Sequence, residues 1–214
     1  YSLSVDINFP LPFATCYMDG NYSHNVVFSP GFGSPKSFLS FKNGVNMAVY
    51  DAYNEIQDNS GWFLSGYDPS DLEGWHNIKV VASNGWTHFY VDGNEVGSPV
   101  EFVLNEELAI IGNYNPDYYW GCQWSGLLDN AKIYIGGHEE SNLFSHYNFN
   151  EGEGIGITGT SGSPNGVLRG GVTWSPNSII NVNEDICCYD ADNDSDDDGI
   201  CGDVDTCPYD AEND

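Results

Sequence analysis

The sequence predicts an all-β fold, an antiparallel sandwich of short strands. Runs of apolar and aromatic residues recur at intervals of about 8 to 12 residues, with Gly, Asn, Asp and Pro between them. No window shows the apolar periodicity of an amphipathic helix. The 214 residues are 40% hydrophobic and 14% aromatic, so most of the chain can bury a core of its own.

Several segments carry strand patterns. Residues 1–9 (YSLSVDINF) alternate with the period of two that is typical of a half-buried strand. The further runs rich in apolar or aromatic residues are NVVF (25–28), SFLSF (37–41), NMAVY (46–50), HNIKVVAS (76–83), THFYV (87–91), LAII (108–111) and LLDNAKIY (127–134). Asn84 and Gly85 predict a turn, and the triplet Asp92, Gly93 and Asn94 predicts a tight hairpin, because these residue types tolerate positive φ.

The charge of the chain argues against polyanionic partners. Its 32 acidic residues face only five basic ones, which gives a formal net charge of −27. Nucleic acid and anionic membrane surfaces would be strongly repelled, and no run of about 20 apolar residues is available to span a bilayer. The chain opens on a strand pattern without a basic leader, which predicts a mature or trimmed fragment.

The composition changes near residue 180 and predicts two domains, 1–180 and 181–214. The first holds the strand patterns, whereas the last thirty residues carry twelve acids and neither lysine nor arginine. The six cysteines lack the paired spacing of a zinc site, so disulfides are predicted. Because disulfides persist in oxidising surroundings, the protein is expected to be secreted or displayed on a cell surface, that is, extracellular.

The acidic segment contains a calcium-binding pattern. In DSDDDGICGDVD, Asp194, Asp196 and Asp198 take positions 1, 3 and 5 of a calcium loop, the carbonyl of Ile200 takes position 7, and Asp205 takes position 12. So many hard oxygen donors favour calcium over zinc or copper. Further candidates, for a second ion, are Asp190, Asp192 and Asp203. The alternative is a merely solvated acidic linker.

One aromatic connection is the candidate ligand-binding site. The stretch NYNPDYYWGCQW contains Tyr114, Tyr118, Tyr119 and Trp120. Aromatic faces stack against the C–H faces of sugar rings, and nearby Asn and Asp side chains can bond to hydroxyls. The alternative is that these rings cover the end of the core. The remaining tryptophans are expected in core or edge packing: Trp62, Trp75, Trp86, Trp124 and Trp174.

The sequence does not predict an enzyme. Glycoside hydrolysis needs two carboxylates that act together across one bond, whereas the spacing of Glu55 and Asp58 in NEIQD places them on opposite faces of a strand. There is no GxSxG or HExxH motif. His76 is expected to pack or to hydrogen-bond structurally rather than to act in catalysis.

The first domain resembles a known family. The string GWHNIKVVASNGWTHFYVDGNEVG, followed by LAIIGNY and WSGLLDNAKIYIG, is similar to the second half of LamG-like domains, which are concanavalin A-type jelly rolls. The resemblance covers residues 1 to about 136 and implies a jelly-roll sandwich. The matching positions are Trp75, His76, Tyr90, Val91, Asp92, Gly93, Gly112, Gly126, Asp129, Ile133 and Tyr134.

One segment departs from the order of this family. A pattern that usually begins such domains occurs here late, as HYNFNEGEGIGITGTSGSPNGVLRGGVTW at 146–174. It could begin a second sandwich or complete the first from its C-terminal side. Only about ten residues separate it from the acidic segment, so completion is expected, with HYNFN and GVTW in edge or inner-sheet places.

The acidic segment resembles a second family. DNDSDDDGICGDVDTCP is similar to the thrombospondin type 3 repeat, and YDADND at 189–194 returns as YDAEND at 209–214. This resemblance implies a short, irregular, calcium-wrapped and disulfide-pinned segment in which the metal replaces a hydrophobic core. Pairing of Cys201 with Cys207 is expected there, with Cys187 or Cys188 left for another partner. Cys16 and Cys122 are expected to pair because they border strands that are neighbours in the LamG-like fold.

Together these features predict a non-catalytic extracellular recognition or adhesion module. It would bind a glycan or a protein surface and carry the start of a calcium-stiffened stalk. Two alternatives stay open: a structural subunit that associates with itself in an extracellular filament or matrix, and an accessory carbohydrate-binding domain of a larger secreted polysaccharide hydrolase.

Overall fold

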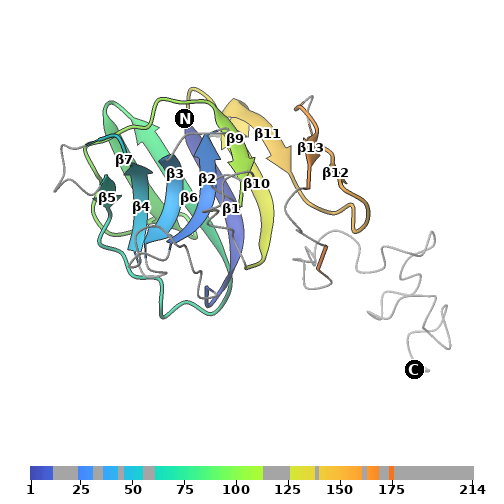
Figure 1. Ribbon diagram of the computed structural model, residues 1–214, viewed down its shortest axis with the longest axis horizontal. Helices are drawn as coiled ribbons and strands as arrows, with labels where there is room; N and C mark the ends of the chain where they lie inside the picture. Colours follow the sequence, from blue (N-terminus) through green and yellow to red (C-terminus); the bar gives the residue numbers. More distant parts are fainter. Residues whose placement is uncertain are drawn as a thin grey trace. The chain divides into compact units, whose positions relative to one another are not determined.

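The computed structural model describes residues 1–11, 24–30, 36–42, 46–54, 61–112, 126–137, 140–160, 163–168 and 174–175 (Figure 1). The chain divides into two units, Tyr1–Pro176 and Asn177–Asp214, and every described residue lies in the first. The predicted all-β antiparallel sandwich is confirmed. Within the described residues the only helical element is one turn of 3₁₀-helix, Glu140–Asn142, and none of their helices is long and apolar enough to cross a membrane.

Two antiparallel sheets face each other in this unit (Figure 1). The six-stranded sheet has the order β11-β10-β1-β6-β7-β8, and the five-stranded sheet has the order β5-β4-β3-β2-β9. The bounds in the first sheet are β1 Ser2–Phe9, β6 Gly74–Ser83, β7 Trp86–Val91, β8 Asn94–Glu95, β10 Leu128–Tyr134 and β11 Leu143–Tyr147. Those in the second are β2 His24–Pro30, β3 Lys36–Lys42, β4 Asn46–Asp51, β5 Trp62–Leu64 and β9 Leu108–Ile111.

The core lies between the sheets, and β1, β6 and β7 contribute alternate residues to it. Leu3, Val5 and Ile7 of β1 are at most 2% exposed, and β6 and β7 add side chains of the same kind, such as Val80 and Phe89. The facing sheet contributes further apolar and aromatic residues: Val27, Phe28, Phe38, Leu39, Phe41, Met47, Val49 and Phe63. The period of two in residues 1–9 therefore reflects an apolar side of β1 that faces the core and a polar side that faces away from it.

Both predicted turns are confirmed. Asn84 and Gly85 have φ of 51° and 86° and join β6 to β7. Asp92 and Gly93 have φ of 49° and 77°, and they close a two-residue hairpin in which Val91 pairs with Asn94. Positive φ at both central residues is what such a hairpin requires, and it favours Asp-Gly at this place.

The structure adds elements that the strand patterns did not reveal. β5 has only three residues and packs at the edge of its sheet against β4, and a run this short carries no readable alternation. β12 (Gly156–Ile157) and β13 (Gly166–Val167) form a separate two-stranded sheet. These strands are too short to produce an apolar run of their own.

The tryptophans only partly follow the prediction of core or edge packing. Trp62 is 5% exposed, whereas Trp75 and Trp174 are partly exposed. Trp86 is 40% exposed, so the prediction is wrong for this residue. Its cross-strand partner is Ser83, which is too small to cover an indole ring, and both lie on the side of the sheet away from the core.

The late segment begins within β11, the edge strand of the six-stranded sheet, and supplies its last two residues, His146 and Tyr147. β11 pairs with β10, and His146 forms an antiparallel bridge with Thr160. Tyr147 and Phe149 pack against the core cluster. GVT at 171–173 lies outside the described residues, so the domain boundaries and the completion of the sandwich by 146–174 stay predictions.

A deletion tests the role of this segment. Removing residues 146–174 should lower the melting temperature or cause aggregation, because the loss of Tyr147 and Phe149 uncovers the core. A matched pair of point variants sharpens the test. Tyr147→Ala should cost about 2 kcal/mol or more in the free energy of unfolding, whereas Phe144→Ala, on the same strand but 54% exposed, should cost much less. Urea unfolding gives both values, and equal losses would contradict the packing role.

Candidate binding surface

The side of the six-stranded sheet that faces away from the core is the candidate surface, and we call it the outer face. The strand register places outward-facing residues in rows across the sheet, since directly paired residues point to the same side. One row runs over five strands through Lys132, Ser4, Lys79, Tyr90 and Glu95. The outer face therefore combines small, cationic, aromatic and acidic side chains in a fixed order.

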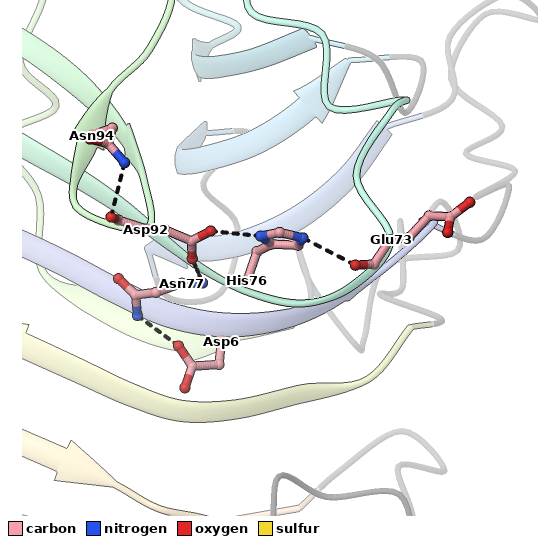
Figure 2. A network of polar contacts seen from close by, with 6 residues as sticks. All are labelled: Asp6, Glu73, His76, Asn77, Asp92 and Asn94. Atoms are coloured by element: carbon pink, nitrogen blue, oxygen red, sulfur yellow. Dashed lines mark hydrogen bonds and ion pairs between the residues drawn. The ribbon is translucent and has the colours of Figure 1, made fainter.

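A second set of outward side chains forms a hydrogen-bonded polar network. The Asp6 carboxylate accepts from Asn77 Nδ2 at 2.7 Å and from Asn130 Nδ2 at 3.0 Å. Asn130 Oδ1 lies 3.3 Å from His146 Nε2. The Asn77 backbone N–H donates to Asp92 Oδ1 at 2.9 Å (Figure 2). The network thus links β11, β10, β1, β6 and the hairpin after β7, and it satisfies groups that would otherwise be costly to cover.

His76 is held at one end of this network. Its Nδ1 lies 2.7 Å from Asp92 Oδ2, and its Nε2 lies 3.1 Å from the carbonyl oxygen of Glu73 (Figure 2). The ring also packs edge-on against Phe9, with centroids 5.9 Å apart. With an oxygen acceptor against each ring nitrogen, the imidazole is fixed in orientation. These contacts support the expected structural role of His76, which is to pack and to form hydrogen bonds.

The carboxylates of the polar network, Asp6 and Asp92, are committed to these contacts. Both oxygens of Asp6 accept from amide groups, and both oxygens of Asp92 are bonded as well. Asp129 is the Cα partner of Asp6 on β10 but is only 1% exposed. Glycoside hydrolysis needs two carboxyl groups that can reach one bond of a bound sugar. This acid pair offers one bonded carboxylate and one buried one.

Side chains on β10 and the 3₁₀ turn form a further bonded group. Tyr134 donates its hydroxyl to Glu140 Oε1 at 3.0 Å. Burial, together with this bond, raises the pKa of Tyr134 to about 12, so its hydroxyl remains a donor over the physiological range.

Burial lowers the pKa of His146, which keeps that ring neutral near pH 7 and favours its contact with an amide oxygen.

The lysines are engaged with acids or aromatic rings. Lys36 Nζ lies 2.6 Å from Glu106 and 3.4 Å from Asp51, and the bond to Glu106 is the main reason that the pKa of this lysine is raised. Lys132 Nζ lies 3.4 Å from Glu140. Two further ammonium groups lie over aromatic rings, Lys42 over Trp62 at 5.3 Å and Lys79 over Tyr90 at 5.6 Å.

The site residues expected from the sequence lie outside the described residues. This holds for the calcium positions from Asp190 to Asp205, for the aromatic connection with Tyr114, Tyr118, Tyr119 and Trp120, for the six cysteines, and for Glu55 and Asp58. Over the described ranges, no group of three or more His, Cys, Asp or Glu side chains is placed to hold a metal ion. The roles expected for these residues therefore stay predictions.

The sequence alone does not predict the outer face as a site. The polar and aromatic residues of β6 alternate with the buried ones, so an outward-facing Trp75, Asn77 and Lys79 could have been read from the sequence. The pairing of these residues with Asp6 and Tyr90 could not, because register depends on strands that are far apart in the chain.

Substitutions of Asp92 test the polar network. Asp92→Ala should destabilise by about 1 to 2 kcal/mol, since it removes two hydrogen bonds and places alanine at positive φ. Asp92→Asn keeps one acceptor and a residue that tolerates this φ, so its cost should be smaller. Glu95→Ala is the control, because its pair with His88 is exposed and should contribute little. Chemical unfolding measures all three, and equal effects of Asp92→Ala and Glu95→Ala would contradict the structural role.

The comparison with known families agrees with this architecture. A laminin G model described as "Concanavalin A-like lectin/glucanases superfamily" matches residues 15–136, which is more than half of the chain. No curated protein matches, and neither does a solved structure. The matched range runs from the strands of the five-stranded sheet to the end of β10. The chain belongs to the concanavalin A-like lectin/glucanases superfamily, as one of its laminin G-like members.

Proposed function

We propose that the chain is an extracellular recognition module that binds a glycan or a protein surface and does not catalyse a reaction. Laminin G-like domains are in general carbohydrate- or protein-binding modules and are typically extracellular. This supports the binding role and the extracellular location. The family also includes glucanases, so the choice between binding and hydrolysis depends on this chain's own side chains.

The state of the outer-face carboxylates carries the choice. Asp6 and Asp92 are bonded on both oxygens, and Asp129 is buried. None of the three therefore has an oxygen that is both exposed and unbonded. Glu95 has one, but no second carboxylate lines the surface groove beside it, and glycoside hydrolysis needs a pair. The same face exposes Tyr90 and Trp86, together with amide groups, and these are the side chains that recognise sugars or peptides.

The net charge restricts the ligand. At −27 the chain repels sulfated and other polyanionic glycans. A neutral glycan, or a protein surface of neutral or basic character, is the expected partner. The aromatic connection with Tyr118 and Trp120 remains a candidate contact, since its residue types suit stacking on sugar rings.

We further propose that residues 181–214 bind calcium and form the start of a stalk. The support is the spacing of the acids, with Asp194, Asp196, Asp198 and Asp205 at oxygen-donor positions of a calcium loop. The thirteen carboxylates of this segment, with no lysine or arginine among them, repel one another unless a cation lies between them. Disulfides within this segment, such as Cys201 with Cys207, would add to the same stiffening.

A glycan array tests the recognition function. The full chain should bind neutral oligosaccharides and should not bind heparin or other sulfated glycans, because of charge repulsion. The array is read without calcium and with about 2 mM calcium, a concentration that would saturate an extracellular calcium-binding module. A parallel incubation with each bound oligosaccharide, followed by chromatography, should return it uncleaved. Release of shorter products would contradict a purely binding role.

Calorimetric titration tests the calcium proposal. The full chain should bind calcium with a Kd of roughly 10⁻⁴ to 10⁻³ M. Asp198→Ala combined with Asp205→Ala should abolish binding at that loop, whereas Asp68→Ala with Asp71→Ala, in the sandwich, should not. Hydrogen exchange should show that chelation loosens residues after about 185 and leaves β1 and β6 protected. Equal protection with and without chelator would identify the segment as a solvated linker.

A further inference from the structure

We infer that a groove on the outer face, bordered by Val81, Ser83, His88, Tyr90, Glu95 and Gly137, is a binding site for a neutral saccharide. This inference rests on the proposed recognition function and assigns it a place. The groove has a volume of about 440 Å³, within the range of ligand-binding clefts in proteins.

The shape of the groove follows from the strand register. Val81 and His88 are a cross-strand pair that faces outward, and Ser83 continues the same side of β6. On the opposite border the chain leaves β10 through Gly136 and Gly137. A Cβ at Gly137 would lie 2.6 Å from Asn142 Nδ2, so a larger residue here would have to displace the Asn142 side chain. The result is a trough bordered by side chains of β6 and β7 on one side and by Gly136 and Gly137 on the other, and Tyr1 also lines it.

Tyr90 supplies the aromatic surface of this trough. Lys79 lies over its ring at 5.6 Å but does not line the groove, so the lysine steadies the ring from outside. Burial is the main cause that raises the pKa of the Tyr90 hydroxyl, and the hydroxyl therefore stays a neutral hydrogen-bond donor. A ring with a fixed position and a hydroxyl at its tip suits the mixed apolar and polar faces of a sugar.

His88 and Glu95 supply directional polar groups. His88 Nδ1 lies 2.7 Å from Glu95 Oε1, which orients both side chains. Glu95 Oε2 and His88 Nε2 have no hydrogen-bond partner within the described part of the chain. A preoriented carboxylate oxygen and ring nitrogen beside an aromatic ring can bond to neighbouring sugar hydroxyls with little loss of side-chain entropy.

The charge of the surroundings favours a neutral occupant. Glu95 contributes the acid of the groove wall, and the ammonium group of Lys79 stands nearby, so the local charges oppose each other. A polyanion would meet Glu95 within a chain of net charge −27. A basic peptide could pair with Glu95, but Lys79 would repel it, and the trough offers no second carboxylate among its lining residues.

The test uses the full chain and tetrasaccharides of β-1,4-glucose, β-1,3-glucose, β-1,4-mannose and β-1,4-xylose. Any neutral oligosaccharide that binds on the glycan array is tested as well. Titration calorimetry gives the Kd. Tyr90→Ala should weaken binding by about tenfold or more, as expected for the loss of one stacking ring. Glu95→Gln, a conservative and exposed change, should weaken it by about threefold to tenfold. Both variants should keep the wild-type melting temperature within a few degrees.

The control is Tyr53→Ala. Tyr53 is 71% exposed and has Lys36 over its ring at 5.7 Å, so it repeats the lysine–tyrosine contact outside the groove. Tyr53→Ala should leave the Kd unchanged. Tyr118→Ala with Tyr119→Ala, in the aromatic connection that is the other candidate contact, is measured beside it. Binding that is lost in the Tyr118 and Tyr119 variant but kept in Tyr90→Ala would overturn the groove and leave the recognition function standing. No saccharide binding by the wild type, or binding of oligolysine alone, would overturn the saccharide function and the groove together.

Discussion

The structure depends on β1, a central strand whose inward side has to fill the core and whose outward side has to accommodate the side chains of both neighbouring strands. The strand pairs with β6 along all eight of its residues and with β10 on its other side, so neither edge is free. Its inward side must fill the core, which Leu3, Val5 and Ile7 do at almost no exposure. Its outward side must leave room for the long side chains of two neighbours, and small residues such as Ser4 at 4% exposure meet that need. The rows of the outer face follow from this one register.

Much of the fold could be predicted because its signals are local. Period-two alternation in residues 1–9 and the Asp-Gly pair of the hairpin are set within a few neighbouring residues, so the local sequence alone identifies them. β5 and the exposure of Trp86 could not be predicted, because they depend on what lies opposite across the sheet. The groove belongs to the same class, since it joins β6, β7 and the turn after β10. The calcium positions are readable from spacing alone and remain predictions.

Acids on the outer face have two separate tasks. Asp6 and Asp92 serve the fold, because they are saturated by amide, backbone and imidazole partners. Glu95 has one bonded oxygen and one open to solvent, and it lies beside an aromatic ring. The number of hydrogen-bonded oxygens therefore separates structural carboxylates from those that can bind a ligand. It does so even for carboxylates whose exposed fractions are similar.

Because the chain has few basic residues, dissolved cations contribute to the stability of its native state. The lysines described above are already held by acids or rings, so they cannot balance the remaining carboxylates of a chain with a net charge of −27. Dissolved cations must supply that balance, as a diffuse ion atmosphere around the sandwich. Ionic strength thereby becomes a variable of the native state: seawater or extracellular fluid relieves the self-repulsion of this chain, and dilution restores it.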